Sequence, residues 1–290
     1  MNILPIILIT IFFLSLIFSY LSMISHKNSL ETIKDMGIGY NLGNLFDSFS
    51  IKIKTPEEQI TLNGNTFPTK NMIKKLKKYG FKTIRFPVTW IHFIDDYGNI
   101  DSNWMLLVKE VINLIIKEEL YCILNIYKDG YFENWLSSDI NAKDKFINLW
   151  SQIANEFKDY NHYLIFESMD DVYFYDPETF IYNFELLLIF NQAFVNIIRN
   201  SGGNNIKRLL LVAGVHEDLD MTCSSEFKMP VDPSNKLALS LHYYIPQAFA
   251  IEPYYDPYNW TDNEGISYSY EPSLSWGAKM NILKLLQILK

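Results

Sequence analysis

The sequence predicts an α/β fold of the TIM-type (β/α)8 barrel class, with about six of its eight strand–helix units present. Two observations lead to this prediction. Short apolar runs alternate with longer amphipathic stretches, a pattern typical of parallel strands joined by covering helices. The glycine-rich segment at residues 37–43 carries Leu42 where a dinucleotide-binding fingerprint needs its third glycine. A barrel is therefore favoured over a doubly wound sheet.

The first half of the chain contains three expected strands, at residues 36–42, 81–87 and 121–126. A polar loop that includes Pro56 and Pro68 follows the first of them. Residues 70–79 predict a helix, because apolar side chains recur on one face with lysines opposite, and Gly80 ends it. Residues 104–119 repeat this amphipathic pattern over a greater length before the third strand.

The second half continues the alternation around residues 163–166, an apolar run that predicts a strand buried on both faces. A helix is expected before it, at residues 142–157, and another after it, at residues 180–199. Gly202 and Gly203 break that second helix. The remaining expected elements are strands at 208–212 and 237–241, a Tyr/Pro-rich loop at 246–276 and a helix at 280–289.

Composition limits the functional classes. The chain has 290 residues, of which 49% are hydrophobic, so it can form one large domain. Its formal net charge of -8 argues against nucleic-acid binding, which needs a basic surface. The histidines and cysteines lack metal-ligand spacing, so we predict no metal and no cofactor. Cys122 and Cys223 are expected to be free thiols. The aromatic content suits sugar stacking, and it equally suits an ordinary well-filled interior.

The N-terminal sequence predicts that the chain is exported from the cytoplasm. No charged residue occurs from Ile3 to Ile24, so residues 1–28 are expected to be a signal peptide or a membrane anchor. Residues 29–290 would then form a partial barrel domain, secreted or membrane-anchored outside the cell. The glycosylation pattern that starts at Asn259 is compatible with this location.

Polar residues gather at the ends of five of the six expected strands. They are Asn44, Arg85, Tyr127, Lys128, Asp170, Asp171, His242 and Tyr244. Each has an ordinary structural interpretation: Arg85 can pair with a buried carboxylate, and His242 can be a core histidine with its hydrogen bonds satisfied. In a β/α barrel, however, the carboxyl ends of the strands meet at one rim, where active sites form. The pattern therefore predicts an active-site mouth.

Several of these segments together resemble glycoside hydrolase family 5, the cellulase-type barrels, and especially its endo-β-1,4-glucanases and xyloglucanases. The segments that carry the resemblance lie at residues 39–44, 80–90, 124–126, 164–167 and 237–244. The resemblance runs from about residue 34 to the end of the chain. It implies a (β/α)8 barrel, retaining hydrolysis by two glutamates about 5–5.5 Å apart, and a β-glucan or related polysaccharide as the partner.

The resemblance also implies roles for individual residues. The family places its proton donor in an Asn-Glu pair after the fourth strand, and this chain has Asp170 and Asp171 there, so Asp171 occupies the acid/base position. The implied substrate-binding residues are Asn44, Arg85, Tyr127, Asp170, His242, Tyr244 and Trp276. The family's His-His pair after the third strand is replaced by Tyr127 and Lys128. The family's nucleophile follows a seventh strand, which this sequence is not expected to reach.

These departures predict that turnover is impaired. Removing a covalent nucleophile removes the step that divides the reaction in two. The predicted elements are also two strands and two helices short of a (β/α)8 barrel. Their absence would leave the first and sixth strands with unpaired edges. Three explanations are open: a truncated gene model, a decayed gene, or a protein completed by a partner. The first two together are favoured.

Two alternatives to an impaired hydrolase are considered. A non-catalytic polysaccharide-binding protein would use aromatic side chains at the mouth, such as Trp135, Tyr244 and Trp276. An enzyme with another carboxylate would take it from the loop after the sixth strand. The candidates there are Glu252, Glu264 and Glu271. A loop lacks the rigidity that such a site needs, so this alternative ranks last.

Overall fold

The computed structural model describes residues 27–127, 142–170, 184–215 and 219–242, together with the backbone of residues 259–261 and 267–269. Six strands form one parallel sheet in chain order. They are β1 (Gly39–Asn41), β2 (Thr83–Phe86), β3 (Tyr121–Tyr127), β4 (Leu164–Asp170), β5 (Leu210–Ala213) and β6 (Leu237–Ser240). The expected α/β architecture with six parallel strands is confirmed.

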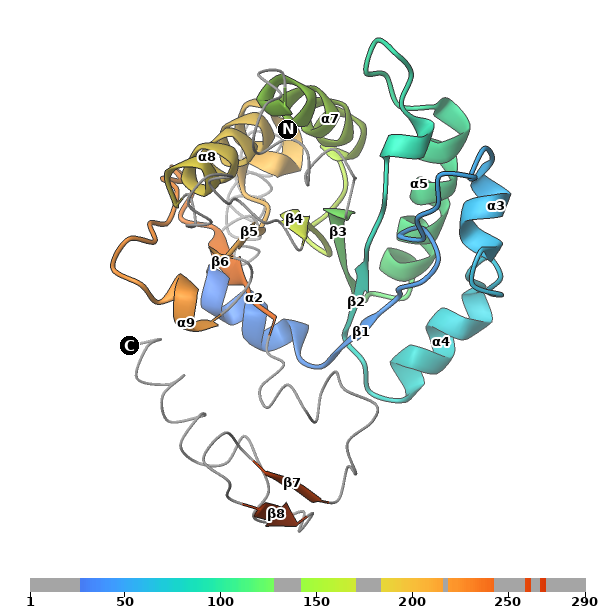
Figure 1. The fold of residues 1–290 in the computed structure, drawn as a ribbon, viewed down its shortest axis with the longest axis horizontal. Helices are drawn as coiled ribbons and strands as arrows, with labels where there is room; N and C mark the ends of the chain where they lie inside the picture. Colours follow the sequence, from blue (N-terminus) through green and yellow to red (C-terminus); the bar gives the residue numbers. More distant parts are fainter. Residues whose placement is uncertain are drawn as a thin grey trace, which may run out of the picture.

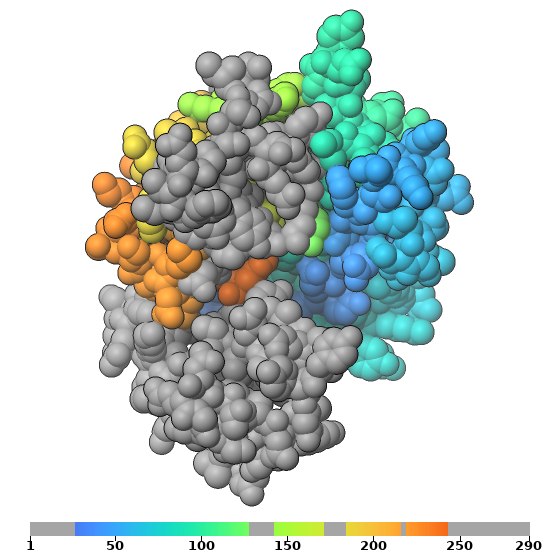
Figure 2. Space-filling model, in the orientation of Figure 1, coloured from blue at the N-terminus to red at the C-terminus, as the bar shows by residue number. Residues whose placement is uncertain are grey.

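Helices connect the strands and lie outside an arc of strands (Figure 1). The α-helices are α2 (Ser29–Met36), α3 (Pro56–Thr61), α4 (Lys70–Lys78), α5 (Ser102–Lys117), α7 (Ala142–Phe157), α8 (Phe184–Asn200) and α9 (Leu219–Thr222). Two 3-10 helices are η1 (Ile91–Phe93) and η2 (Gly203–Ile206). In Figure 2 blue residues from the early part of the chain are visible on the right of this face, and the orange residues before β6 are visible on its left.

Large aromatic side chains fill the layer between the sheet and its helices. Trp90, Trp104 and Trp150 are fully buried. The ring of Trp150, on α7, lies 4.6 Å from that of Phe194 on α8, edge to face, a favourable geometry for aromatic pairs. These tryptophans therefore belong to the interior, and they do not supply the sugar-stacking surface that the aromatic content allowed.

Helix α2 ties the start of the described chain to both sides of the sheet. The side chain of Asn28 accepts a hydrogen bond from the first turn of the helix and caps it. Ser29 Oγ donates to the backbone oxygen of Asn235, just before β6, at 3.1 Å. Thr83 Oγ1, on β2, donates to the backbone oxygen of Met36 at 2.7 Å. The helix thus joins the amino-terminal ends of β2 and β6, which are far apart in the chain.

Three sequence predictions about element bounds were wrong. The expected first strand starts only at Gly39, because Met36 closes α2. The expected polar loop contains α3, which Thr55 caps and in which Pro56 occupies a first-turn position. The expected loop at residues 246–276 contains the antiparallel pair β7 (Asn259–Thr261) and β8 (Ser267–Ser269). The helix expected at residues 280–289 lies outside the described residues.

Both cysteines are free, as expected, with Cys122 buried and Cys223 exposed. The apolar stretch at residues 3–24 also lies outside the described residues. Within the part of the chain that is described, no helix has the length and apolar character needed to cross a membrane.

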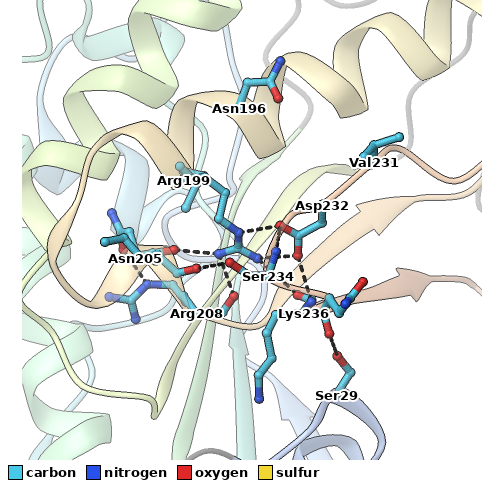
Figure 3. Close-up of polar contacts among 12 residues, drawn as sticks. Ser29, Asn196, Arg199, Asn205, Arg208, Val231, Asp232, Ser234 and Lys236 are labelled. Atoms are coloured by element: carbon cyan, nitrogen blue, oxygen red, sulfur yellow. Dashed lines mark hydrogen bonds and ion pairs between the residues drawn. The ribbon is translucent and has the colours of Figure 1, made fainter.

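A buried arginine pair fastens the amino-terminal ends of β5 and β6 (Figure 3). Arg199, at the end of α8, donates through Nε and Nη2 to the two carboxylate oxygens of Asp232, at 2.8 and 2.9 Å. Arg208 Nε donates to Asn205 Oδ1 at 2.6 Å. The other nitrogens of Arg208 reach four backbone oxygens, from residues in α7, in β4 and in the turn between them. The pair thus joins the end of α8 and the segments before β5 and β6 to α7, β4 and the turn between them, at the amino-terminal end of the sheet.

The glycine pair after α8 adopts the break that was expected. Both glycines have positive φ, 78° at Gly202 and 57° at Gly203. A Cβ added to Gly203 would lie 2.8 Å from the backbone oxygen of Lys158, which is closer than packed atoms approach. The position therefore needs glycine for two reasons, the backbone conformation and the close approach of a second chain segment.

We expect Gly203→Ala to lower the free energy of unfolding by about 2–4 kcal/mol, since strain and a backbone clash add. Gly64→Ala is the matched control, because Gly64 also has positive φ, 74°, but no atom lies within 4 Å of the added Cβ. The control should lose about 1 kcal/mol. Urea denaturation of both variants measures the difference, and equal losses would contradict the close approach.

Candidate active site

Arg85 reaches the inside of the sheet because side chains alternate along β2. Ile84 and Phe86 are fully buried in the layer beneath the helices. Arg85, between them, therefore points to the opposite face. The Arg85 side chain is 19% exposed to solvent. The alternation of apolar and polar residues in β2 thus delivers a guanidinium group to the interior of the barrel, at the carboxyl end of the strand.

An irregularity in β4 places two carboxylates on this same face. Asn125 in β3 pairs with Glu167 in β4, but Tyr127 pairs with Asp170, so β4 carries one extra residue. Such a bulge changes which side chains share a face. Met169 joins the layer beneath the helices, whereas Glu167 and Asp170 both contact Arg85. Without the extra residue, alternation would have separated the two carboxylates.

The sequence prediction for β4 needs a correction. The expected strand ended at residue 166, with the acidic residues in an exposed cleft after it. The strand instead continues through Asp170, and all seven of its residues are buried. Glu167 and Asp170 are only 1% and 2% exposed. They remain buried because each is paired with a cation, which offsets part of the cost of removing a charge from water.

Glu167 is the centre of the hydrogen-bond network. Its Oε2 atom accepts from Arg85 Nε at 2.8 Å and from Asn125 Nδ2 at 2.8 Å, and it lies 2.6 Å from Arg85 Nη2. Its Oε1 atom accepts from Ser240 Oγ, in β6. One buried carboxylate therefore joins side chains from β2, β3, β4 and β6, and this holds Arg85 in a single orientation.

Asp170 extends the network to the end of β6. Its Oδ1 atom lies 2.8 Å from Arg85 Nη2 and 3.2 Å from His242 Nε2. Three residues predicted to be at the mouth, Arg85, Asp170 and His242, are thus brought together. The alternative in which Arg85 pairs with a buried carboxylate holds as well, since Glu167 is that carboxylate.

The loop after β1 borders the network on its other side. Arg85 Nη1 donates to Asn41 Oδ1 at 3.2 Å. Asp47 follows on the same loop, and its Oδ1 accepts from the backbone N–H of Leu45 at 2.8 Å. Burial raises the pKa of Asp47 above its usual value, although backbone N–H groups and the charge of Arg85 oppose that rise. Asp47 is thus a further partly buried carboxylate near the guanidinium.

The remaining predicted residues take different positions. Tyr127 ends β3 beside Asp170, and its backbone oxygen accepts from Thr89 Oγ1 at 3.0 Å. Asn44 lies on the loop after β1, where its backbone oxygen accepts from Asn65 Nδ2. Other predicted positions lie outside the described part of the chain. They are Asp171, Tyr244 and Trp276, with Lys128, Trp135, Glu252, Glu264 and Glu271.

Sequence reasoning missed three members of the network as site residues. They are Asn41, Asn125 and Ser240, whereas Glu167 was expected beside Asp171. Each of the three is a polar residue within an expected strand, and each reaches Arg85 or Glu167. That signal was present in the sequence, but the register that brings these residues together was not.

A parallel β/α sheet with carboxylate, guanidinium and imidazole groups converging at the carboxyl ends of its strands is the active-site architecture of a β/α-barrel enzyme. Comparison with known proteins identifies the family. The family model "Cellulase (glycosyl hydrolase family 5)" matches residues 47–281. The chain belongs to this family, so the resemblance seen in the strand ends is confirmed, together with the (β/α)8 fold class.

Characterised relatives support the same assignment. Endoglucanase A of Paenibacillus barcinonensis is 37% identical over 240 residues, which cover 75% of this chain and 58% of that protein. Endoglucanase A of Clostridium longisporum is 33% identical over 241 residues, covering 79% of this chain and 46% of that protein. The chain thus spans about half the length of these relatives.

Solved structures agree in fold. A broad-specificity endoglucanase of this family from an uncultured bovine rumen ciliate is 47% identical, with a TM-score of 0.77 over 91% of this chain and 74% of that one. A family 5 lichenase from Caldicellulosiruptor sp. F32, solved with cellotetraose, is 29% identical, with a TM-score of 0.75 over 91% of this chain and 73% of that one. The chain is therefore a glycoside hydrolase-like protein by descent and by fold.

Proposed function

We propose that this chain carries the catalytic barrel of an endo-β-1,4-glucanase and binds β-glucan at the mouth formed by β1, β2, β4 and β6. The observation that carries the proposal is the convergence of Arg85, Glu167, Asp170 and His242. Arg85 and His242 are the more exposed members, at 19% and 28% of their side chains. They are therefore the groups of this network that a polysaccharide hydroxyl can reach.

We further propose that turnover is low. Retaining glycosidases need a carboxylic acid at a fixed distance from the leaving oxygen. Asp171 occupies that position by resemblance, and its side chain is one methylene shorter than the family's glutamate. A misplacement of about 1 Å can cost roughly 100-fold in rate. Binding of β-glucan should survive this change better than hydrolysis does, because binding depends on the whole mouth.

Hydrolysis of xyloglucan, lichenan and carboxymethyl cellulose by the chain tests the proposal, with release of reducing ends as the readout. We expect little or no activity, and any activity that is present should be abolished by Asp171→Ala. Glu226→Ala is a control, since Glu226 is an exposed acidic residue after α9. Activity that is untouched by Asp171→Ala would contradict the role of Asp171.

A non-catalytic β-glucan-binding protein is the second candidate. The observation in its favour is that Asp170, in the acidic pair of the acid/base position, is already paired with Arg85 and His242. Retention on insoluble β-glucan without any hydrolysis, even by Asp171→Glu, would favour this candidate. Absence of both binding and hydrolysis would exclude both functions.

We also propose that the chain acts outside the cell, because its polymeric substrate cannot enter one. The support is the uncharged stretch from Ile3 to Ile24. Fusing residues 1–28 to a reporter enzyme that works only after export tests this proposal. Export of the reporter is expected, and its retention in the cytoplasm would contradict it.

A further inference from the structure

We propose that Asp170 is a positioning residue that couples Arg85 to His242 across the mouth and so sets how both side chains face a bound glucan. The inference deepens the proposed function and rests on it for the identity of the ligand. The coupling itself stands on geometry alone. One oxygen, Oδ1, lies 2.8 Å from Arg85 Nη2 and 3.2 Å from His242 Nε2.

Relative exposure shows that Asp170 acts through its neighbours. Its side chain is 2% exposed, whereas those of Arg85 and His242 are 19% and 28% exposed. The carboxylate therefore lies beneath the two basic groups. A polymer that enters the mouth meets the guanidinium and the imidazole first, and Asp170 can influence it only by holding them.

The two carboxylates of β4 make different contacts and so have different structural roles. Glu167 already binds Arg85 through Nε and Nη2 and binds Ser240 in β6. Arg85 would thus keep its orientation without Asp170. His242, in contrast, follows the end of β6, and Asp170 is the described residue that ties its ring to Arg85. The extra residue in β4 lies between Glu167 and Asp170, and it turns Asp170 to the face where this contact is made.

Charge favours the same coupling. Asp170 on β4 lies against both Arg85 and His242, Glu167 on β4 pairs with Arg85, and Asp47 after β1 interacts electrostatically with Arg85. The Asp170 carboxylate favours the protonated form of the His242 imidazole, because an opposite charge within about 4–6 Å favours the charged state, whereas the charge of Arg85 opposes it.

Titration of the His242 ring by NMR tests the coupling without any need for activity. The His242 signals are assigned by their loss in His242→Gln. We expect the pKa of His242 to be lower by about one pH unit in Asp170→Asn than in the parent chain. Asp35→Asn is the matched control, since Asp35 pairs with Lys27 and Tyr121 at the other end of the barrel. It should leave the titration of His242 unchanged.

Binding of cellotetraose, measured by calorimetry, tests the consequence for the ligand. Asp170→Asn and His242→Gln should each weaken binding by about fivefold, the loss of one ordinary hydrogen bond. The double variant should be no weaker than either single one, because the two residues act as a unit.

Two outcomes would overturn the proposal: an unchanged His242 titration in Asp170→Asn, or additive losses of affinity. If the parent chain binds no cellotetraose, the proposed function fails, while the titration still decides the coupling. Should Asp170→Asn fail to fold, Asp170→Glu takes its place. Glutamate keeps the charge but moves it by one methylene, so the His242 titration is expected to shift in that variant too. An unchanged titration in Asp170→Glu would likewise overturn the coupling.

Discussion

Replacing Arg85 by methionine is expected to lower the free energy of unfolding by about 3–5 kcal/mol, because it leaves two buried carboxylates without their cation. Glu167 and Asp170 are 1% and 2% exposed, and both lie within 2.8 Å of the guanidinium. Methionine fills a similar volume, so lost packing contributes little. Equilibrium unfolding in urea at pH 7 measures the change.

A matched control is a lysine-to-methionine change in a surface ion pair. Lys109 pairs with Glu156 across α5 and α7, and both side chains are about one-third exposed. Lys109→Met should cost less than about 1 kcal/mol. Adding Glu167→Gln to Arg85→Met should recover part of the loss, since one uncompensated charge is removed. A double variant less stable than Arg85→Met alone would show that the hydrogen bonds from Asn125 and Ser240 stabilise Glu167 more than the charge of Arg85 does.

Replacing Arg199 by methionine is expected to cost a similar amount, about 3–5 kcal/mol, at the opposite end of the barrel. Arg199 and Asp232 are 6% and 2% exposed at their side chains and share two hydrogen bonds. Arg199 also donates to the backbone oxygens of Asn205 and Arg208. The change therefore leaves a buried carboxylate and two backbone oxygens with fewer donors. Thermal and urea unfolding measure the loss.

The Asp232 pair also predicts a dependence on pH. Burial alone would raise the pKa of Asp232. Hydrogen bonds from Arg199 and from backbone N–H groups lower it by more than burial raises it, so the net pKa lies below its usual value. A carboxyl whose pKa is lower in the folded state stabilises the fold above its unfolded pKa of about 3.9. That contribution is lost as the pH falls through the folded pKa. Asp232→Asn should show a smaller loss of stability between pH 5 and pH 3 than the parent chain does.

Several elements followed from the sequence because their signals are local. The helix α7 was expected with the bounds that it has, since its apolar residues recur on one face over four turns. The break after α8 was expected from Gly202 and Gly203, whose positive φ angles no other residue adopts as readily. The strands β3 and β6 were placed to within one residue. The short helices α2 and α3 were not expected at all, although each begins with a capping side chain, Asn28 and Thr55.

The candidate site, too, could be predicted from the sequence only in part. By itself, the sequence determined that Arg85, Asp170 and His242 lie near the carboxyl ends of parallel strands, and those ends meet at one rim. Only the tertiary structure decided which of these groups touch. The extra residue in β4 turns Asp170 toward Arg85, and the register of β3 and β6 brings Asn125 and Ser240 to Glu167. Register depends on pairing between distant segments, and no local pattern of residues encodes it.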